Sequence, residues 1–165
     1  MKRLISICGS DGDDERLNGF ATEVAEKIGM LVALKDGVIV CGGCGGVMEA
    51  VCRGAKQKNG LTVGILPYEK DCANDFIDIA IPTRIGHIRN FLVSGTGDVT
   101  IAIGGRWGTL NEIAHRMIIE KPLILIKGTG GCVDEIINGN LMQDVESHYH
   151  VAGSAEEAVE LAFNL

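Results

Sequence analysis

Seven short apolar runs, each about the length of a β-strand, constrain the fold of this chain more than any other feature. They are rich in β-branched residues and continuous rather than alternating with polar residues. A strand that is apolar on both faces is covered on both faces, as in a parallel sheet flanked by helices. The runs are Leu4–Cys8, Val38–Cys41, Leu61–Leu66, Ile77–Ile81, Val99–Ile103, Leu123–Ile126 and a weaker Tyr149–Ala152.

Segments with helical spacing lie between most of these runs. The repeated order of strand and then helix predicts an α/β fold, a doubly wound parallel sheet with helices on both faces. The polar stretch at residues 67–75 is expected to be an irregular surface loop. The expected helices are Arg16–Gly29, Val47–Lys58, Ile88–Gly95, Thr109–Glu120 and a last one from about Ser154, where Ser-Ala-Glu-Glu reads as a capping box.

Length and cysteine content favour one self-sufficient domain. No linker or low-complexity tract divides the 165 residues, so we predict a single domain over residues 1–165. A domain of this size buries about two thirds of its unfolded surface and needs no disulfide or metal for support. The six cysteines are therefore expected to be reduced thiols.

Charge and hydropathy exclude several classes of partner. With 15 Lys and Arg against 22 Asp and Glu, the formal net charge is −7 at pH 7. Binding to DNA, RNA or an anionic membrane through charge is therefore not expected. No apolar run reaches the roughly 18 residues of a membrane span, and the first run is too short for a secretion signal. We expect a cytoplasmic protein.

Glycine is in excess, with 23 residues where average usage of about 7% would give roughly 12. Three glycine-containing turns directly follow expected strands, at residues 8–12, 41–46 and 104–109, and each opens a helix. The carboxyl ends of parallel strands share one edge of the sheet, so these turns should converge. Helix N-termini bind anions, and glycine lets a phosphate approach closely. A phosphorylated ligand is therefore expected, the alternative being that glycine only permits tight turns.

The usual nucleotide-binding signatures are missing from these turns. None ends in Gly-Lys-Ser/Thr, and the first does not read Gly-x-Gly-x-x-Gly. The second strand also carries no acidic residue at its end that would hold a ribose in the dinucleotide manner. A standard ATP or NAD site is not expected.

Four motifs resemble those of the Lonely Guy (LOG) superfamily, whose members were long labelled "possible lysine decarboxylase". Asn90 follows Arg89 where phosphoribohydrolases carry Arg-Lys, and Ile103 stands where they usually have Pro. The Arg-Asn pair is more similar to the branch that contains molybdenum-cofactor carrier proteins, and both departures are consistent with a non-catalytic carrier. In order, the motifs are Gly-Gly-Cys-Gly-Gly-Val-Met-Glu-Ala at 42–50, Gly-Ala at 54–55, His-Ile-Arg-Asn at 87–90 and Gly-Gly-Arg-Trp-Gly-Thr-Leu-Asn-Glu at 104–112.

The resemblance implies a Rossmann-like sheet, a homo-oligomer (homodimer or homotetramer), and a site for a nucleotide or pterin phosphate at the carboxyl edge. It implies no required cofactor. In hydrolase members, the Arg and Glu of two motifs cleave the N-glycosidic bond of a nucleoside 5′-monophosphate. Carried over, these candidate catalytic residues are Arg89 and Glu112.

The chemistry of Glu112 suits that role. It lies three residues after Thr109, about one helical turn on, so its carboxylate can face whatever the glycine turn holds. A carboxylate there can stabilise an oxocarbenium-like state or deprotonate the attacking water. The alternative is a first-turn Glu that only complements the helix dipole.

The candidate binding residues come from the same motifs and turns. Arg84 and Arg106 are cations for a phosphate, although both could equally be exposed, and Thr109 offers a hydroxyl or caps its helix. Met48 is a soft wall of the pocket or simple packing, and Glu49 could approach the base or ribose. The full set is Gly9, Ser10, Gly42, Gly43, Gly45, Gly46, Met48, Glu49, Arg84, Asn90, Gly104, Gly105, Arg106, Trp107, Gly108 and Thr109.

These observations leave several functions open. The first is binding of a phosphorylated nucleotide-like ligand, with hydrolysis of a nucleoside monophosphate to base and ribose 5-phosphate. The second is a non-catalytic carrier or sensor of molybdenum cofactor, a pterin phosphate or a nucleotide phosphate. Metal or redox chemistry at Cys8, Cys41 and Cys44 is a weaker alternative, because no second CxxC or His pair completes a zinc site. Nothing resembles a pyridoxal-phosphate lysine site.

Overall fold

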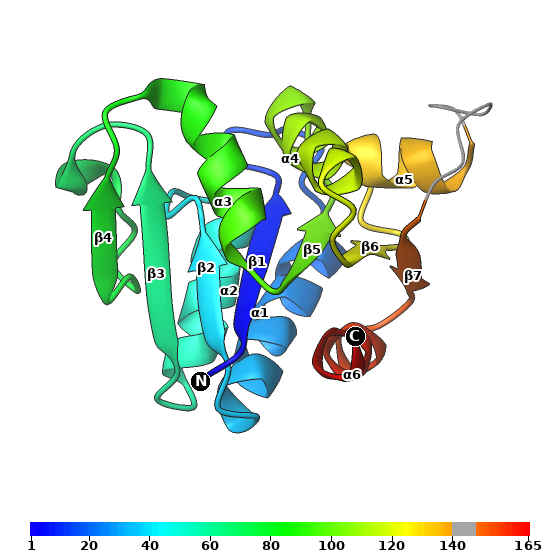
Figure 1. Ribbon diagram of the computed structural model, residues 1–165, viewed down its shortest axis with the longest axis horizontal. Coiled ribbons are helices and arrows are strands. Elements are labelled where there is room, and N and C mark those ends of the chain that lie inside the picture. Colours follow the sequence, from blue (N-terminus) through cyan, green and yellow to red (C-terminus); the bar gives the residue numbers. More distant parts are fainter. Residues whose placement is uncertain (140–147) are drawn as a thin grey trace.

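The computed structural model describes residues 1–139 and 148–165, and within them the strands form one parallel sheet (Figure 1). The chain starts near the centre, adds strands to one side, and then returns to build the other side. The spatial order is β4-β3-β2-β1-β5-β6-β7, and every pairing is parallel. The strands are β1 Leu4–Gly9, β2 Val38–Cys41, β3 Leu61–Leu66, β4 Ile79–Pro82, β5 Val99–Ile103, β6 Leu123–Ile126 and β7 His150–Ala152.

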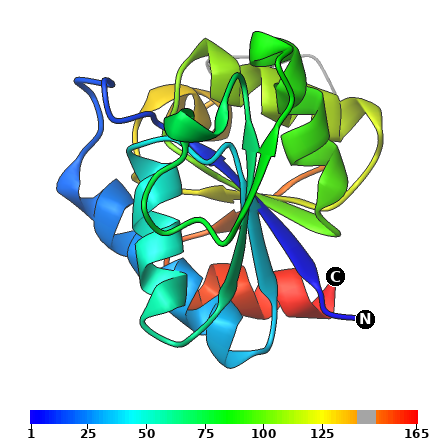
Figure 2. The ribbon, with the colours of Figure 1, turned by 90° about the vertical axis from the view of Figure 1, so that its left-hand side faces the viewer.

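Helices cover both faces of this sheet, as predicted. Figure 2 shows the sheet nearly edge-on between the two helical layers. One layer consists of α1 Gly19–Leu34, α2 Val47–Lys56 and α6 Ala155–Asn164, and the other of α3 Asn90–Thr96, α4 Trp107–Ile118 and α5 Gly131–Ile137. The architecture is a doubly wound, Rossmann-like α/β fold, and the order of the strands reverses between β1 and β5.

Continuous apolar strands supply a core to each layer. In β5, the Ile101 and Ile103 side chains join the cluster under α1, α2 and α6, whereas Ala102 joins the cluster under α4 and α5. All three residues are fully buried. The strand lacks polar alternation because both of its faces are buried, as predicted.

Helices α1 and α2 pack closely because, at two places, a glycine of one helix lies directly against the backbone of the other. A Cβ on Gly29 would lie 2.0 Å from the Val51 carbonyl oxygen, and one on Gly54 would lie 1.9 Å from the Glu26 carbonyl oxygen. Any side chain at either position would push the helices apart. The close contact fixes the two helices that follow the first two glycine turns.

Several element boundaries differ from the predicted ones. Helix α1 begins at Gly19, because the Asn18 side chain accepts a hydrogen bond from the Ala21 N–H (2.7 Å) and caps it. Strand β4 begins at Ile79, because the carboxylate of the preceding Asp78 accepts a hydrogen bond from the Thr62 N–H (3.0 Å).

One predicted helix needs correction, and one observed helix was not predicted. The segment predicted as one helix over 88–95 is a 3₁₀ turn, Gly86–Arg89, followed by α3. Helix α5 was not predicted, because it has only seven residues and begins in a run of glycine. The residue 67–75 loop contains a short 3₁₀ turn, Lys70–Cys72. The Ser154 cap is confirmed, since its hydroxyl accepts a hydrogen bond from the Glu157 N–H (3.2 Å).

None of the helices in the described ranges has both the length and the apolar character needed to cross a bilayer.

Candidate binding site at the carboxyl edge of the sheet

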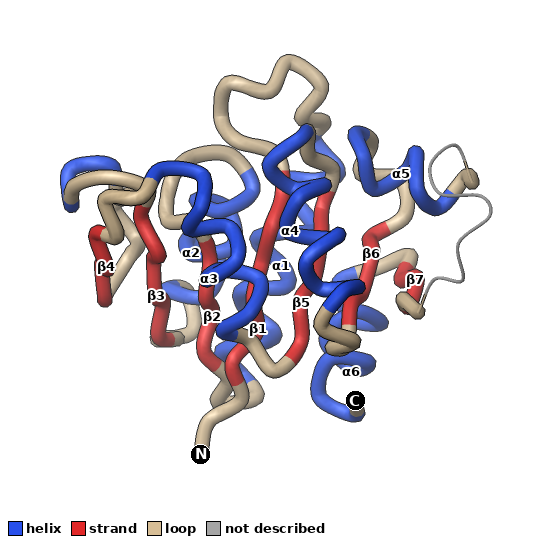
Figure 3. Tube along the Cα trace, turned by 45° about the horizontal axis from the view of Figure 1, so that its top comes forward, coloured by secondary structure: helices blue, strands red, loops and turns tan. Residues whose placement is uncertain are grey.

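The three glycine turns converge at the carboxyl ends of β1, β2 and β5. The Ser10 hydroxyl accepts a hydrogen bond from the Gly105 N–H (2.8 Å), which joins the first turn to the third. The Ser10 carbonyl accepts one from the Val47 N–H (2.9 Å), which joins the first turn to the second. Figure 3 shows the loops that follow these strands at one end of the sheet.

A cavity of about 130 Å³ opens beside these turns. It lies where the strand order reverses, which is the usual ligand position in an open α/β sheet. Its walls come from the end of β1, the start of α2, the 3₁₀ turn before α3, and the first turns of α4. The lining residues are Gly9, Asp11, Met48, His87, Arg89, Asn90, Arg106, Gly108, Thr109 and Glu112.

Arg89 is the cation that the fold buries at this cavity. The residue is only 7% exposed, and its Nε has no hydrogen-bond partner among the described residues. Its guanidinium lies against Gly42, where a Cβ would come within 1.9 Å of Nη1. A buried charged donor without a partner is costly, and a hydrogen-bond acceptor on a ligand, most strongly an anion, would offset that cost.

Glu112 is a second buried titratable residue of this cavity, with 6% of its surface exposed. It is one turn along α4 from Thr109, as predicted. Burial raises the pKa of its carboxyl to about 8, although the positive charge of Arg89 pulls that pKa down. At neutral pH the group is therefore mostly a neutral acid, able to donate a proton or a hydrogen bond.

The N-terminus of α4 supplies a second anion-binding element. Arg106 stands at the N-cap position, and in the described part of the chain its side chain makes no capping hydrogen bond. Uncapped first-turn N–H groups and the helix dipole both favour a negative ligand group. Gly108 and Thr109, in that first turn, line the cavity. Arg106 also lines it, but its guanidinium forms an ion pair with Asp13.

Two lining residues were missed in the sequence analysis. Asp11 sits in the first glycine turn, where its carboxylate accepts a hydrogen bond from the Gly12 N–H (2.7 Å). His87 stands two residues before Arg89 in a motif that the resemblance already singled out. Their positions beside predicted residues were the available signal, but neither carries a distinctive spacing of its own.

Several predicted residues lie outside the cavity and instead support its walls. Ser10, Gly104 and Gly105 connect the first turn to the third. Gly45 and Gly46 pack against the backbone and side chain of the first turn, and Gly43 packs on Leu66 and Gly64. The positive φ angles of Gly43, Gly46, Gly104 and Gly105 show why glycine is used in these turns.

Three other predicted residues have different surroundings. The Arg84 side chain is 68% exposed and pairs with Glu69, with Nε 2.7 Å from the carboxylate. The Glu49 side chain is partly exposed, with its carboxylate 3.8 Å from Nη1 of Arg53. Trp107 is 83% exposed and lines a neighbouring cavity rather than this one.

The three cysteines considered for metal or redox chemistry do not gather. Cys41 pairs with Cys52, with 3.6 Å between the two Sγ atoms, while Cys8 points its Sγ toward the Ile101 carbonyl. Cys44 donates to the Gly42 carbonyl. Over residues 1–139 and 148–165, no three His, Cys, Asp or Glu residues are grouped in a way that could hold a metal ion.

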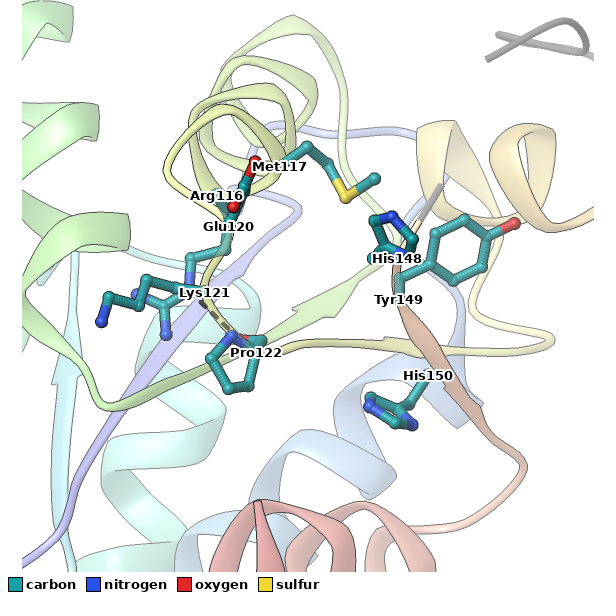
Figure 4. Close-up of a pocket in the computed structure, with 8 residues that line it drawn as sticks. All are labelled: Arg116, Met117, Glu120, Lys121, Pro122, His148, Tyr149 and His150. Carbon is teal, nitrogen blue, oxygen red and sulfur yellow. Dashed lines mark hydrogen bonds between the residues drawn. The ribbon is translucent and has the colours of Figure 1, made fainter. Parts of the chain in front are cut away.

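A larger cavity, of about 560 Å³, lies at the amino ends of β6 and β7 (Figure 4). None of the predicted site residues lines it. Its buried cation, Arg116, donates to the carbonyls of Ser94, Gly97, Asp98 and Pro122. That guanidinium is therefore satisfied by the protein itself, in contrast to Arg89.

Comparison with known proteins supports the assignment of the fold and branch. The molybdenum cofactor binding protein from the phototrophic bacterium Rippkaea orientalis is 33% identical, with a TM-score of 0.87 over 99% of this chain and 97% of that one. The molybdenum cofactor carrier protein from Chlamydomonas reinhardtii is 26% identical, with a TM-score of 0.83 over 100% and 98% of the two chains.

A more distant relative has a different description. A probable cytokinin riboside 5′-monophosphate phosphoribohydrolase from Oryza sativa subsp. japonica is 25% identical over 181 residues, 100% of this chain and 78% of that protein. Together these similarities confirm the predicted resemblance to the LOG superfamily and to its molybdenum-cofactor-carrier branch. A family model matches residues 2–159, and the chain belongs to the SLOG cluster4 family.

Proposed function

We propose that the 130 Å³ cavity binds the phosphate of a nucleotide-like or pterin-like ligand. The observation that carries this proposal is the buried Arg89 guanidinium, whose Nε has no partner over residues 1–139 and 148–165, beside the N-terminus of α4, where the N-cap residue Arg106 makes no capping hydrogen bond. The two features meet in one cavity, and each favours a negative group. The ligand needs no further cofactor in this proposal.

A carrier role fits this site best. Glu112 is mostly protonated at neutral pH, so its charge does not oppose an anionic ligand there. The similar structures from Rippkaea orientalis and Chlamydomonas reinhardtii are described as molybdenum cofactor binding and carrier proteins. At the positions of Asn90 and Ile103, hydrolases of the superfamily carry Lys and, usually, Pro. The chain would hold its ligand and release it unchanged.

Hydrolysis is the second candidate, because Arg89 and Glu112 line the same cavity. The rice relative is described as a phosphoribohydrolase. In that reaction, water would replace the base on C1′ of a nucleoside 5′-monophosphate and give free base and ribose 5-phosphate. A neutral Glu112 suits protonation of the leaving base, so the rate should fall as the pH rises above about 8.

Calorimetric titration with AMP, GMP, CMP and a pterin phosphate tests the binding proposal. We expect Arg89→Met to weaken binding at least tenfold, since it removes a buried charge. Arg84→Met is the matched control, because Arg84 is exposed and paired with Glu69. Equal affinities for the native protein and the Arg89 variant would reject the proposed site.

Chromatographic detection of free base separates the two candidates. A carrier binds the monophosphates and releases no base over many hours. A hydrolase releases base, and Glu112→Gln should abolish release while preserving binding. Base release that survives in the Gln variant would remove Glu112 from the mechanism.

We also propose that the chain forms homodimers or homotetramers through contacts at Leu92 of α3 and at Ile118, which lies at the opposite end of α4 from Trp107. Leu92 is 46% exposed and Ile118 is 77% exposed, and both are large apolar side chains. Light scattering should give a mass of two or four chains, and Leu92→Glu combined with Ile118→Glu should lower it. A monomer at high concentration would contradict this proposal.

A cytoplasmic location remains part of the proposal. All six cysteines are free, including Cys41 and Cys52, whose Sγ atoms lie 3.6 Å apart. Free thiols at such close range suit a reducing compartment. Thiol titration of the freshly isolated, denatured protein should find six reactive groups, and fewer would argue against that location.

A further inference from the structure

A second cavity, of about 400 Å³, adjoins the first. The two share His87, Asn90 and Gly108 as lining residues, so they are neighbours at the surface. The buried polar residues that line the first cavity are Arg89, Asn90, Thr109 and Glu112. The second opens along the first turn of α4 and the start of α3.

The sizes of the two parts decide how a nucleotide-like ligand would lie. Pockets for drug-sized ligands usually have volumes of roughly 300 to 1,000 Å³. The first cavity, at about 130 Å³, is smaller than that range, so we expect it to hold the phosphate end of such a ligand and not the whole of it. The ring of such a ligand must therefore extend into the second cavity.

The second cavity has the chemistry of a stacking surface. Trp107, the first residue of α4, is 83% exposed, and Ile88 and Phe91 beside it are 65% and 44% exposed. The Phe91 ring meets the His115 ring edge-on, with centroids 4.8 Å apart. His115 is itself held by the Ser94 hydroxyl (2.8 Å). The Phe91 ring is therefore oriented before any ligand arrives.

Asn111 adds a polar group at the edge of this surface. Its Oδ1 accepts a hydrogen bond from the Asn90 amide (3.3 Å), which orients the Asn111 side chain. Within the part of the chain that the structure describes, the Asn111 side-chain amide donates no hydrogen bond, and the residue is exposed. Those donors suit the ring nitrogens and carbonyls at the rim of a heterocycle.

We propose that Trp107 and Phe91 form a stacking platform for a fused, planar heteroaromatic ring, either a purine or a pterin. The phosphate of the same ligand lies at Arg89 and the N-terminus of α4, so the inference rests on the proposed function. The platform selects bicyclic over monocyclic rings, because stacking strength increases with the area of overlap. Asn111 contacts the edge of the ring.

The test uses Trp107 itself, which is the only tryptophan in the chain. Its fluorescence would be recorded during titration with AMP, GMP, CMP and ribose 5-phosphate, with calorimetry in parallel. We expect the purine nucleotides to quench the emission and to bind at least tenfold more tightly than ribose 5-phosphate. Ribose 5-phosphate should bind without quenching, and CMP should fall between.

Two variants separate stacking from folding. Trp107→Leu should reduce purine affinity to that of ribose 5-phosphate and leave ribose 5-phosphate binding unchanged. Trp107→Phe should keep at least half of the purine preference. Because Trp107 is exposed, both variants should unfold at the same denaturant concentration as the native protein.

The outcomes distinguish this inference from the proposed function. If neither ribose 5-phosphate nor any nucleotide binds, the proposed function fails and the platform fails with it. If all bind equally and the emission is unchanged, the platform is refuted and the phosphate site stands. A blue-shifted emission that depends on protein concentration without ligand would show Trp107 covered by a second copy, which also refutes the platform.

Discussion

At the scale of single residues, two buried arginines have opposite states. Arg116 donates to four backbone carbonyls and stabilises the fold. Arg89 has a nitrogen without a partner in the described ranges, and it occupies space that exists only because residue 42 is glycine. The difference between them is the main reason for proposing the ligand site at the carboxyl edge of the sheet.

The contact between Gly42 and Arg89 gives a prediction. In Gly42→Ala, the added methyl would overlap the guanidinium, whose Nη1 lies 1.9 Å from the Cβ position, so Arg89 must move. We expect phosphate-ligand affinity to fall at least tenfold by calorimetry. Gly45→Ala is the matched control, since its Cβ would meet nothing closer than 3.4 Å. Unchanged binding in the Gly42 variant would mean that Arg89 does not hold the ligand.

The buried carboxyl of Glu112 gives a second prediction. Its pKa is raised to about 8 in the folded state and is 4.5 in the unfolded reference. Between these values the folded state binds a proton that the unfolded state has lost, so the stability is fully present below pH 4.5 and falls as the pH rises toward 8. The contribution is about 1.4 kcal/mol per pKa unit.

Urea unfolding at pH 5, 6, 7 and 8 tests that dependence. The native protein should lose more unfolding free energy across this range than Glu112→Gln, which cannot ionise at this position. The difference between the two proteins isolates Glu112 from other titrating groups. Parallel curves would show that the folded-state pKa of Glu112 is close to its ordinary value.

At the scale of elements, the α1 and α2 pair sets the position of the site. Helix α2 follows the second glycine turn directly and carries Met48, which lines the cavity. The pair can approach closely only because Gly29 and Gly54 have no side chains. Gly29 and Gly54 do not line the cavity, but through this packing they set the position of the helix that carries Met48.

Gly54→Ala tests that packing. The methyl group would lie 1.9 Å from the Glu26 carbonyl oxygen, a backbone atom that cannot move aside alone. We expect a loss of about 1–3 kcal/mol in unfolding free energy by chemical denaturation. Gly19→Ala is the control, because nothing lies within 4 Å of its Cβ position and alanine favours the helix. Equal stability of the two variants would refute close packing of α1 and α2.

The sequence predicts elements well where the cause of the structure is local. Apolar runs located each strand that the structure describes, and helical spacing located α1, α2, α4 and α6. Helix α5 was missed, because seven residues that begin with glycine carry too little periodic signal. The 3₁₀ turn that carries Arg89 was read as part of a helix, because spacing alone does not separate the two conformations.

At the scale of the whole molecule, topology explains why the turns could be assigned to one site. Parallel strands end at one edge, so turns distant in sequence were predicted to meet, and hydrogen bonds from Gly105 and Val47 to Ser10 join them. The spacing of residues along the sequence does not show which exposed charged side chains will form ion pairs. Arg84 was therefore chosen as a phosphate ligand, although it pairs with Glu69.

The net charge of −7 also has a whole-molecule consequence. The proposed anionic ligand would approach a negatively charged protein, so its affinity would have to come from local groups such as Arg89 and the start of α4. The burial of Arg89 gives its charge strength, because little water screens it.

A crystal structure of the protein with AMP bound is the most direct test of the central claim. We predict phosphate oxygens within roughly 2.7–3.2 Å of the Arg89 guanidinium and of the Gly108 or Thr109 N–H. The ribose would occupy the 130 Å³ cavity. A nucleotide in the 560 Å³ cavity at the amino ends of β6 and β7, or a phosphate that contacts neither Arg89 nor α4, would contradict the account.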